Sequence, residues 1–552
     1  MNSGSGQFRF RNHNTIGALA AEDDTHFLGE CFVDTGLSQA MQDMADHRRI
    51  VLGRTGSGKS ALLLHLSKVS NAISINPSEL ALDYLSNSEI LAELADAGIS
   101  LQPVYKLLWK HIFVVEILRN VHSQLRDNRE APGFWRNLLG SFSQNAKDQA
   151  RKEALQYLAQ YGDSFWQTTD YRIKEITQKI EEQLKANIGA KLGGGSLGIE
   201  AARTATEERR GVVEQAGKEF VRAIQVKKLN DVVEWLAEDT EGRPSLYIII
   251  DGLDDEWVGL EYKYEMIRAL IDAAKEFRVI RTVKILIALR QDLFEEVLSY
   301  RQGGGFQREK YTQLCYKIQW TRDQLKSIVE KRVNKLIRDA YTTAVVRIDD
   351  IMEPVKGAPG VQYLIDRTLL CPRDVIAFFN ECILRAESNA RITRHMVQAA
   401  EPEYSRARLR ALADEWMSFE PLVAQMAELF RGRRGNLRLR EFSDGYVTDF
   451  CHAFCLKQWN MDSPAVDVAK RHCENPAQVT YREVLRYFVN TLYKVGVIGV
   501  KPAAEVEWQW SAGGRPGIDD LELDDNCGVR VHKAFWCALN ITSGRATGQD
   551  DE

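Results

Sequence analysis

The segment Gly53-Arg54-Thr55-Gly56-Ser57-Gly58-Lys59-Ser60 carries the residues whose types and spacing most clearly predict chemistry. It fits the pattern G-x-x-x-x-G-K-[ST] at every fixed position. In such a loop the backbone N–H groups turn inward around phosphates, and the following helix points the positive end of its dipole at the same anion. We predict a nucleotide-binding segment from Gly53 to Ala61, in which Lys59 reaches the β- and γ-phosphates and the Ser60 hydroxyl binds Mg²⁺.

Several carboxylates follow the apolar run Leu246–Ile250. Asp251 comes directly after this run and is predicted to be the second protein ligand of Mg²⁺. Either Asp254 or Asp255 is predicted to orient and polarise the attacking water, with Glu256 as a less favoured choice. The alternative for these carboxylates is an acidic helix cap, because so many negative charges beside one metal are costly unless only one or two point inward.

Two arginines are candidate contacts to the transferred phosphate. Arg290 follows a third apolar run, residues 283–289, and is predicted to project toward the γ-phosphate, where a cation stabilises transferred charge; a surface salt bridge is the alternative. Arg373 lies in Cys371-Pro372-Arg373-Asp374, where Pro372 predicts the first turn of a helix. That helix is expected to fold over the nucleotide, although a purely structural role fits Arg373 equally well.

The elements that must position these residues predict an α/β fold. The apolar runs 49–52, 246–250 and 283–289 are typical of strands buried on both faces of a parallel sheet covered by helices. We predict a P-loop NTPase core from residues 1–70 and 236–318, interrupted by a large helical insertion over 71–235. A helical lid over 319–400 and a C-terminal winged-helix-like domain over 401–552 follow. The last domain is predicted from a helix at 481–495, a turn at Gly496 and strands near 497–500, 506–510 and 529–531.

Composition limits the partners and the compartment. The 552 residues include 72 Lys and Arg against 77 Asp and Glu, so the net charge of −5 predicts no general attraction to polyanions. A nucleic acid would need a local basic face, for which Arg482, Arg486 and Lys494 are candidates; the acidic stretch 519–525 favours a protein partner instead.

Nine dispersed cysteines predict a reducing, cytoplasmic location. No apolar run approaches the roughly 18–20 residues that span a bilayer, so no membrane association is expected.

Taken together, the motifs GRTGSGKS, IIIDGLDDEW, ALRQDLF, IQWTRDQLKSIVEKRV and CPRDVIAFFNECI resemble the AAA+-related STAND and KAP-like ATPases of bacteria. With AAEDDTHFLGECFVDTG, the resemblance covers about residues 20–390 and extends to P-loop ATPases found in phage-defence and mobile-element neighbourhoods. It implies ATP and Mg²⁺ bound through Lys59, Ser60 and Asp251, with Arg290 as a sensor and Arg373 as a lid arginine. Many AAA+ relatives place a glutamate directly after the metal-binding aspartate, where this chain has Gly252. A slow switch that holds ATP for long periods therefore fits the same residues.

The resulting prediction is a Mg²⁺-dependent ATPase that acts as a nucleotide switch in anti-phage defence or a mobile element, as a homo-oligomer or with a separate effector protein. Two alternatives remain. One is a DNA-binding initiator or transposition-type ATPase. The other is a nucleotide-gated scaffold that binds ATP and turns it over negligibly.

Overall fold

The structure is a computed structural model, and it divides into two compact units. The sheet unit comprises Gly36–Gly53 and Lys59–Ile318, and the helical unit comprises Met1–Thr35, Arg54–Gly58 and Gln319–Glu552. The residues described are 8–80, 101–121, 146–161, 226–238, 243–300, 307–340, 345–417, 419–457, 459, 463–511, 515 and 517–543.

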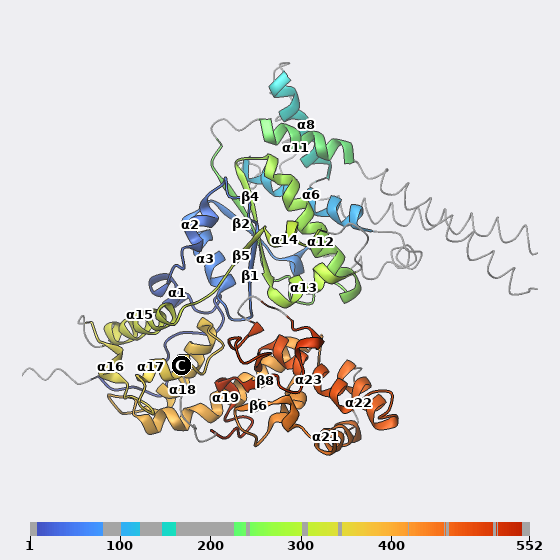
Figure 1. Ribbon diagram of the computed structural model, residues 1–552. Helices are drawn as coiled ribbons and strands as arrows, with labels where there is room; N and C mark the ends of the chain where they lie inside the picture. Colours follow the sequence, from blue (N-terminus) through green and yellow to red (C-terminus); the bar gives the residue numbers. More distant parts are fainter. Residues whose placement is uncertain are drawn as a thin grey trace, which may run out of the picture. The chain divides into compact units, whose positions relative to one another are not determined.

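The sheet unit is built on a five-stranded parallel sheet with the strand order β2-β3-β4-β1-β5 (Figure 1). Its strands are β1 (Ile50–Gly53), β2 (Ala72–Ile75), β3 (Leu246–Ile250), β4 (Val283–Arg290) and β5 (Cys315–Lys317). Every residue of β1 and β3 is buried, as expected of strands covered on both faces. The predicted parallel α/β arrangement is confirmed, whereas the short strands β2 and β5 were not predicted.

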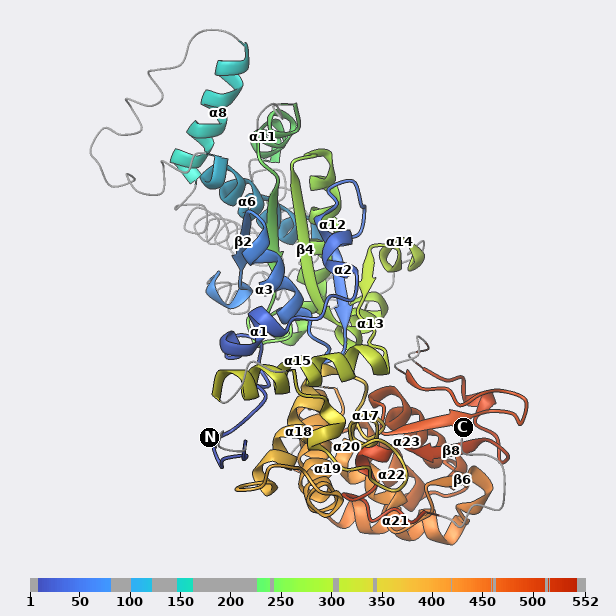
Figure 2. The same cartoon turned by 90° about the vertical axis from the view of Figure 1, so that its left-hand side faces the viewer.

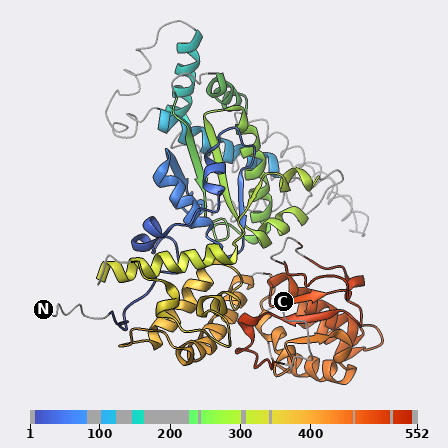
Figure 3. The same cartoon turned by 60° about the vertical axis from the view of Figure 1, so that its left-hand side comes forward.

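Helices cover both faces of this sheet. Figure 1 shows α2 (Leu37–Gln42) and α3 (Lys59–Val69) on one face and α6 (Gln102–Val121), α12 (Leu260–Glu276) and α13 (Gln291–Ser299) on the other, and Figure 3 shows the same division from another side. The Trp109 indole on α6 donates a hydrogen bond of 3.0 Å to the Met266 carbonyl on α12. This unit also contains α8 (Ala146–Tyr161), α11 (Val226–Glu238) and α14 (Glu309–Thr312). Most of the predicted insertion 71–235 lies outside the described residues.

The first part of the helical unit has a core around α15, α17 and α18. Figure 2 shows α17, α18 and α19 gathered on one side of α15. Phe10 and Ile16, from the beginning of the chain, belong to the same core. The helices are α1 (Thr25–Cys31), α15 (Arg322–Ala340), α16 (Ile348–Ile351), α17 (Gly360–Ile365), α18 (Pro372–Arg385) and α19 (Arg394–Trp416).

The second part of the helical unit has its own core and a small antiparallel sheet with the strand order β6-β8-β7. Its elements are α20 (Val423–Ala427), β6 (Asn436–Arg438), α21 (Asp444–Leu456), α22 (Pro464–Glu474), α23 (Tyr481–Val495), β7 (Ile498–Lys501) and β8 (Gly528–Val531). Helix α23 has the predicted bounds because the Thr480 hydroxyl caps its start and Gly496 ends it in the left-handed conformation.

The predicted strand at 506–510 does not form, and only Gln509 pairs with Val500, in an isolated bridge. Trp510 lies over Gly499 instead, where a Cβ atom would be 2.7 Å from its ring. Because the missing side chain of Gly499 leaves this space for the indole, the segment packs on the sheet rather than extending it. Among the described helices, none is both long and apolar enough to cross a membrane.

Candidate functional site

The predicted phosphate-binding segment is a strand, a turn and a helix. Strand β1 ends at Gly53, and α3 begins at Lys59, so Ser60 and Ala61 lie in its first turn. Arg54 and Thr55 begin the turn, which continues through Gly56 and Gly58 with φ angles of +76° and +90°. Only glycine adopts these left-handed conformations without a steric cost. Of these two glycines, Gly58 stands at a fixed position of the motif and Gly56 at a variable one, so the turn gives a conformational reason for one of the motif's two fixed glycines.

Lys59 is buried at the amino end of α3, where its Nζ lies 3.4 Å from the Gly53 carbonyl oxygen. Burial lowers the pKa of Lys59, and the carboxylates of Asp254 and then Asp251 act in the opposite direction. These two carboxylates therefore lie close enough to Lys59 for their charges to matter. Lys59 follows β1 and Asp251 follows β3, so the two residues lie at the same carboxyl edge of the parallel sheet.

The acidic segment after β3 turns sharply at Gly252. Its φ of +84° favours glycine, and a Cβ atom there would lie 3.1 Å from both Asn76 Oδ1 and Asp255 Oδ2. A glutamate directly after Asp251 would not fit this conformation without rearrangement. The Gly252 amide donates a 3.0 Å hydrogen bond to Asp251 Oδ1, which fixes the carboxylate at the strand end.

The carboxylates beyond Gly252 have different surroundings. Lys263 Nζ donates to the backbone carbonyls of Asp254 and Asp255 at 2.9 and 2.8 Å, which holds the turn in place. The Asp255 carboxylate lies against Gly252, whereas Asp254 is the carboxylate that most strongly opposes the lowered pKa of Lys59. Asp254, Asp255 and Glu256 are all exposed.

Arg290 lies at the end of β4, the strand between β1 and β3, in register with Gly53. Its guanidinium makes a two-point ion pair with Asp292, with Nε–Oδ1 and Nη2–Oδ2 distances of 3.1 and 2.6 Å. Both side chains are largely buried, so their orientation is fixed within the sheet unit. Sequence reasoning missed Asp292, although an acid two residues after a strand-end arginine signals such a pair.

In the helical unit, the loop residues Arg54–Gly58 contact Trp320 and the first turn of α18. The Trp320 indole donates a 2.7 Å hydrogen bond to the Ser57 carbonyl oxygen, and the Arg373 amide donates one of 3.3 Å to the Gly56 carbonyl oxygen. A Cβ atom on Gly56 would be 2.8 Å from Arg373 Cβ, so glycine permits this close approach. Arg373 is the second residue of α18, as the Pro372 signal predicted. Sequence reasoning missed Trp320.

Two buried polar atoms near the loop have no hydrogen-bond partner among the described residues, namely Ser57 Oγ and Arg373 Nε. Such atoms are costly unless something pairs with them. Both are donors, as an anion requires. Arg54 differs: its backbone is in the loop, while its Nη2 donates a 2.6 Å hydrogen bond to the Val495 carbonyl at the end of α23.

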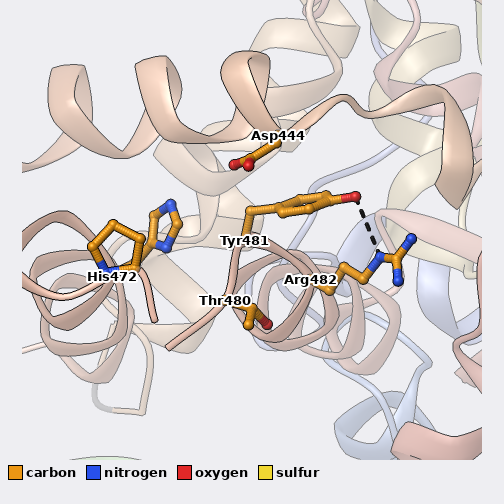
Figure 4. Close-up of a pocket in the computed structure, with 6 residues that line it drawn as sticks. Asp444, His472, Thr480, Tyr481 and Arg482 are labelled. Carbon is orange, nitrogen blue, oxygen red and sulfur yellow. Dashed lines mark hydrogen bonds between the residues drawn. The ribbon is translucent and has the colours of Figure 1, made fainter. Parts of the chain in front are cut away.

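The basic residues predicted on α23 contact the acidic stretch. Arg482 Nη2 is 2.6 Å from Asp525 Oδ2, and Arg486 Nε donates to the Leu523 carbonyl at 3.1 Å. Figure 4 shows Arg482 beside Tyr481, to whose hydroxyl its Nε donates, in a depression that His472 also lines. The acidic stretch therefore covers part of the face predicted for nucleic acid. Lys494 lies further along the helix, near Gly517.

Comparison with known proteins adds two findings. Residues 323–413, from α15 to α19, match a family model described as the FunZ-associated C-terminal helical domain. The chain is also 20% identical over 556 aligned residues to the putative transposon gamma-delta 80.3 kDa protein of Escherichia coli (strain K12). That alignment covers 98% of this chain and 69% of the relative. This chain is distantly similar to a transposon protein over almost its whole length.

Proposed function

We propose that this protein binds and hydrolyses ATP with Mg²⁺, using a P-loop NTPase core. The observation that carries the proposal is the buried Lys59, which begins a helix directly after a glycine turn, at the same sheet edge as the acidic segment that follows β3. A helix amino terminus with inward N–H groups and a lysine is suited to phosphate, and carboxylate oxygens are suited to Mg²⁺. The unpaired donors Ser57 Oγ and Arg373 Nε fit an anion as well.

Each residue then has a defined task. The segment Gly53–Ala61 holds the phosphates, with Lys59 as the point charge. Ser60 and Asp251 hold Mg²⁺, which neutralises charge on the β- and γ-phosphates when it is bound. Asp254 orients the attacking water in this proposal, because its carboxylate is exposed after the turn, whereas the Asp255 carboxylate lies against Gly252.

The two arginines serve the γ-phosphate in this proposal. Arg290 presents a guanidinium whose orientation Asp292 fixes. Arg373 supplies a second cation from the first turn of α18. Loss of the γ-phosphate on hydrolysis removes the group that both cations contact, so the helices of the lid change their arrangement with the nucleotide state.

The biological role we propose is a nucleotide switch of a mobile genetic element, because the relative is named as a transposon protein. The tail is proposed to be winged-helix-like, since α21, α22 and α23 are followed by β7 and β8, which form an antiparallel sheet with β6. A nucleotide-gated scaffold with negligible turnover is the second candidate, and Gly252 in place of a glutamate favours it.

Calorimetric titration of the full chain with ATP, with and without Mg²⁺, tests the proposal. We expect Mg²⁺-dependent binding that Lys59→Ala abolishes. The matched control is Lys68→Ala, which removes an exposed lysine from the last turn of the same helix. Absence of nucleotide binding by the wild-type chain overturns the proposal. Single-turnover phosphate release then separates the hydrolase from the scaffold.

A further inference from the structure

The side chain of Arg54 leaves the phosphate-binding motif and ends at the carboxyl terminus of α23. Val495 is the last residue of that helix, and its carbonyl oxygen accepts a 2.6 Å hydrogen bond from Arg54 Nη2. The last carbonyls of a helix have no intrahelical partner, and they form the negative end of its dipole. A guanidinium at this position therefore satisfies an acceptor and interacts favourably with the helix dipole.

Gly496 gives Arg54 the space to reach this carbonyl. It caps α23 with φ +87°, and its amide and that of Val497 donate to the Tyr493 and Leu492 carbonyls, each at 2.9 Å. A Cβ atom on Gly496 would be 2.6 and 2.8 Å from the Nη2 and Nη1 atoms of Arg54. The guanidinium thus occupies the place that any larger residue at position 496 would need.

A buried charged cluster in the helical unit acts electrostatically on the same guanidinium. Arg408 on α19 forms ion pairs with Asp374 and Glu415 at 3.1 and 3.0 Å, and all three side chains are largely buried. Burial lowers the pKa of Arg54, while Asp374 and Glu415 favour its charged form. Asp374 directly follows Arg373, whose amide contacts Gly56. The loop is therefore held from two sides, by α18 at Gly56 and by the end of α23 at Arg54.

We propose that Arg54 is a positioning residue that links the phosphate-binding loop to the carboxyl end of α23, so that nucleotide affinity and the order of α23 depend on each other. This inference rests on the proposed nucleotide binding. The loop amides bind phosphate only in one backbone conformation, and the backbone of Arg54 is part of that loop. Any change that displaces the Arg54 side chain changes the affinity, and by reciprocity a nucleotide that fixes the loop stabilises the last turn of α23.

The sharpest test substitutes a residue that no nucleotide would touch. Gly496→Ala introduces a Cβ atom at the Arg54 guanidinium, and Gly357→Ala is its matched control. Gly357 has φ +84°, so the backbone cost is similar, but a Cβ atom there would have no neighbouring atom within 4 Å. We expect Gly496→Ala to lose about tenfold or more in calorimetric affinity for Mg²⁺–ATP. Gly357→Ala should bind as the wild type does.

Arg54→Ala and Arg54→Lys complete the test. Arg54→Ala should weaken binding to a similar extent, and adding Gly496→Ala to it should cause no further loss, because the atoms that clash are gone. Arg54→Lys should restore part of the affinity, since one donor can still reach the Val495 carbonyl. In hydrogen–deuterium exchange, ATP should protect the last turn of α23 in the wild type and not in Arg54→Ala.

The outcomes separate this inference from the proposed function. Equal affinities for Gly496→Ala and Gly357→Ala, additive losses in the double variant, or ATP-dependent protection of α23 that survives in Arg54→Ala would each overturn the inference while nucleotide binding stands. A wild-type chain that binds no nucleotide overturns both. Should Gly496→Ala fail to fold, the Arg54 variants and their exchange profiles decide alone.

Discussion

The indole of Trp320 donates a 2.7 Å hydrogen bond to the carbonyl oxygen of Ser57, inside the proposed phosphate-binding motif. In a planar trans peptide, the carbonyl and the following N–H point in opposite directions. The contact therefore turns the Gly58 amide away from Trp320. A tryptophan 263 positions further along the chain thus helps to set the direction of a loop amide.

Trp320→Phe tests that relationship. The phenyl ring keeps most of the packing but cannot donate, so we expect Mg²⁺–ATP affinity to fall by up to about tenfold, the value of one hydrogen bond. Trp459→Phe is the matched control, because it also removes an indole donor to a backbone carbonyl, that of Phe454. Calorimetric affinities that fall equally in both variants would show that the Ser57 contact has no special role.

Asp251→Asn and Asp254→Asn should have different kinetic signatures. We expect Asp251→Asn to raise the Mg²⁺ concentration needed for half-maximal turnover, because one charged ligand of the metal is lost. Asp254→Asn should leave nucleotide affinity unchanged and lower turnover by about a hundredfold, the usual contribution of a general base. Phosphate release across a Mg²⁺ series measures both, with the exposed Asp349→Asn as the control. The same Mg²⁺ profile in all three variants would contradict these assignments.

Stability of the sheet unit should fall in acid because of His111. Its side chain is buried, with Nδ1 2.7 Å from the Tyr157 hydroxyl, and burial lowers its pKa from 6.5 to about 3. The unfolded chain binds a proton on His111 at a higher pH than the folded chain does. The contribution of neutral His111 to the free energy of unfolding is therefore present above pH 6.5 and is lost as pH falls toward about 3. His111→Gln should therefore destabilise the protein most at neutral pH, and urea unfolding at several pH values should show the deficit shrinking in acid. A deficit independent of pH would refute this.

Asp24 should be needed for the stability of the helical unit. Its Oδ2 lies 2.5 Å from Arg332 Nη2, and both side chains are buried. Removing one member of a buried ion pair leaves the other charge uncompensated, so Asp24→Ala should cost about 3–5 kcal/mol in the free energy of unfolding. Glu30→Ala is the control. It removes an exposed carboxylate that pairs with Lys335, which lies on α15 as Arg332 does, and it should change stability little. Denaturant unfolding that ranks the two variants equally would contradict the prediction.

Some features of the fold were predictable because they depend on neighbouring residues. The runs that form β3 and β4 are continuously apolar, and α23 has a capping threonine at one end and a glycine at the other. The strands β2 and β5 are short and carry no such pattern, so only their pairing with β3 and β1 defines them. Likewise the residues around Trp510 predict a strand, whereas the indole packs over Gly499 and only Gln509 forms a bridge.

Local sequence was enough to predict the glycine-rich motif 53–60, the strand that precedes Asp251 and the helix that Pro372 opens, because each depends on the backbone preferences of adjacent residues. The contact of Trp320 with Ser57 and that of Arg54 with the Val495 carbonyl were visible only in the folded protein. These two contacts join residues 263 and 441 positions apart. No local propensity encodes such a distance, since the contacts form only when separate elements pack together.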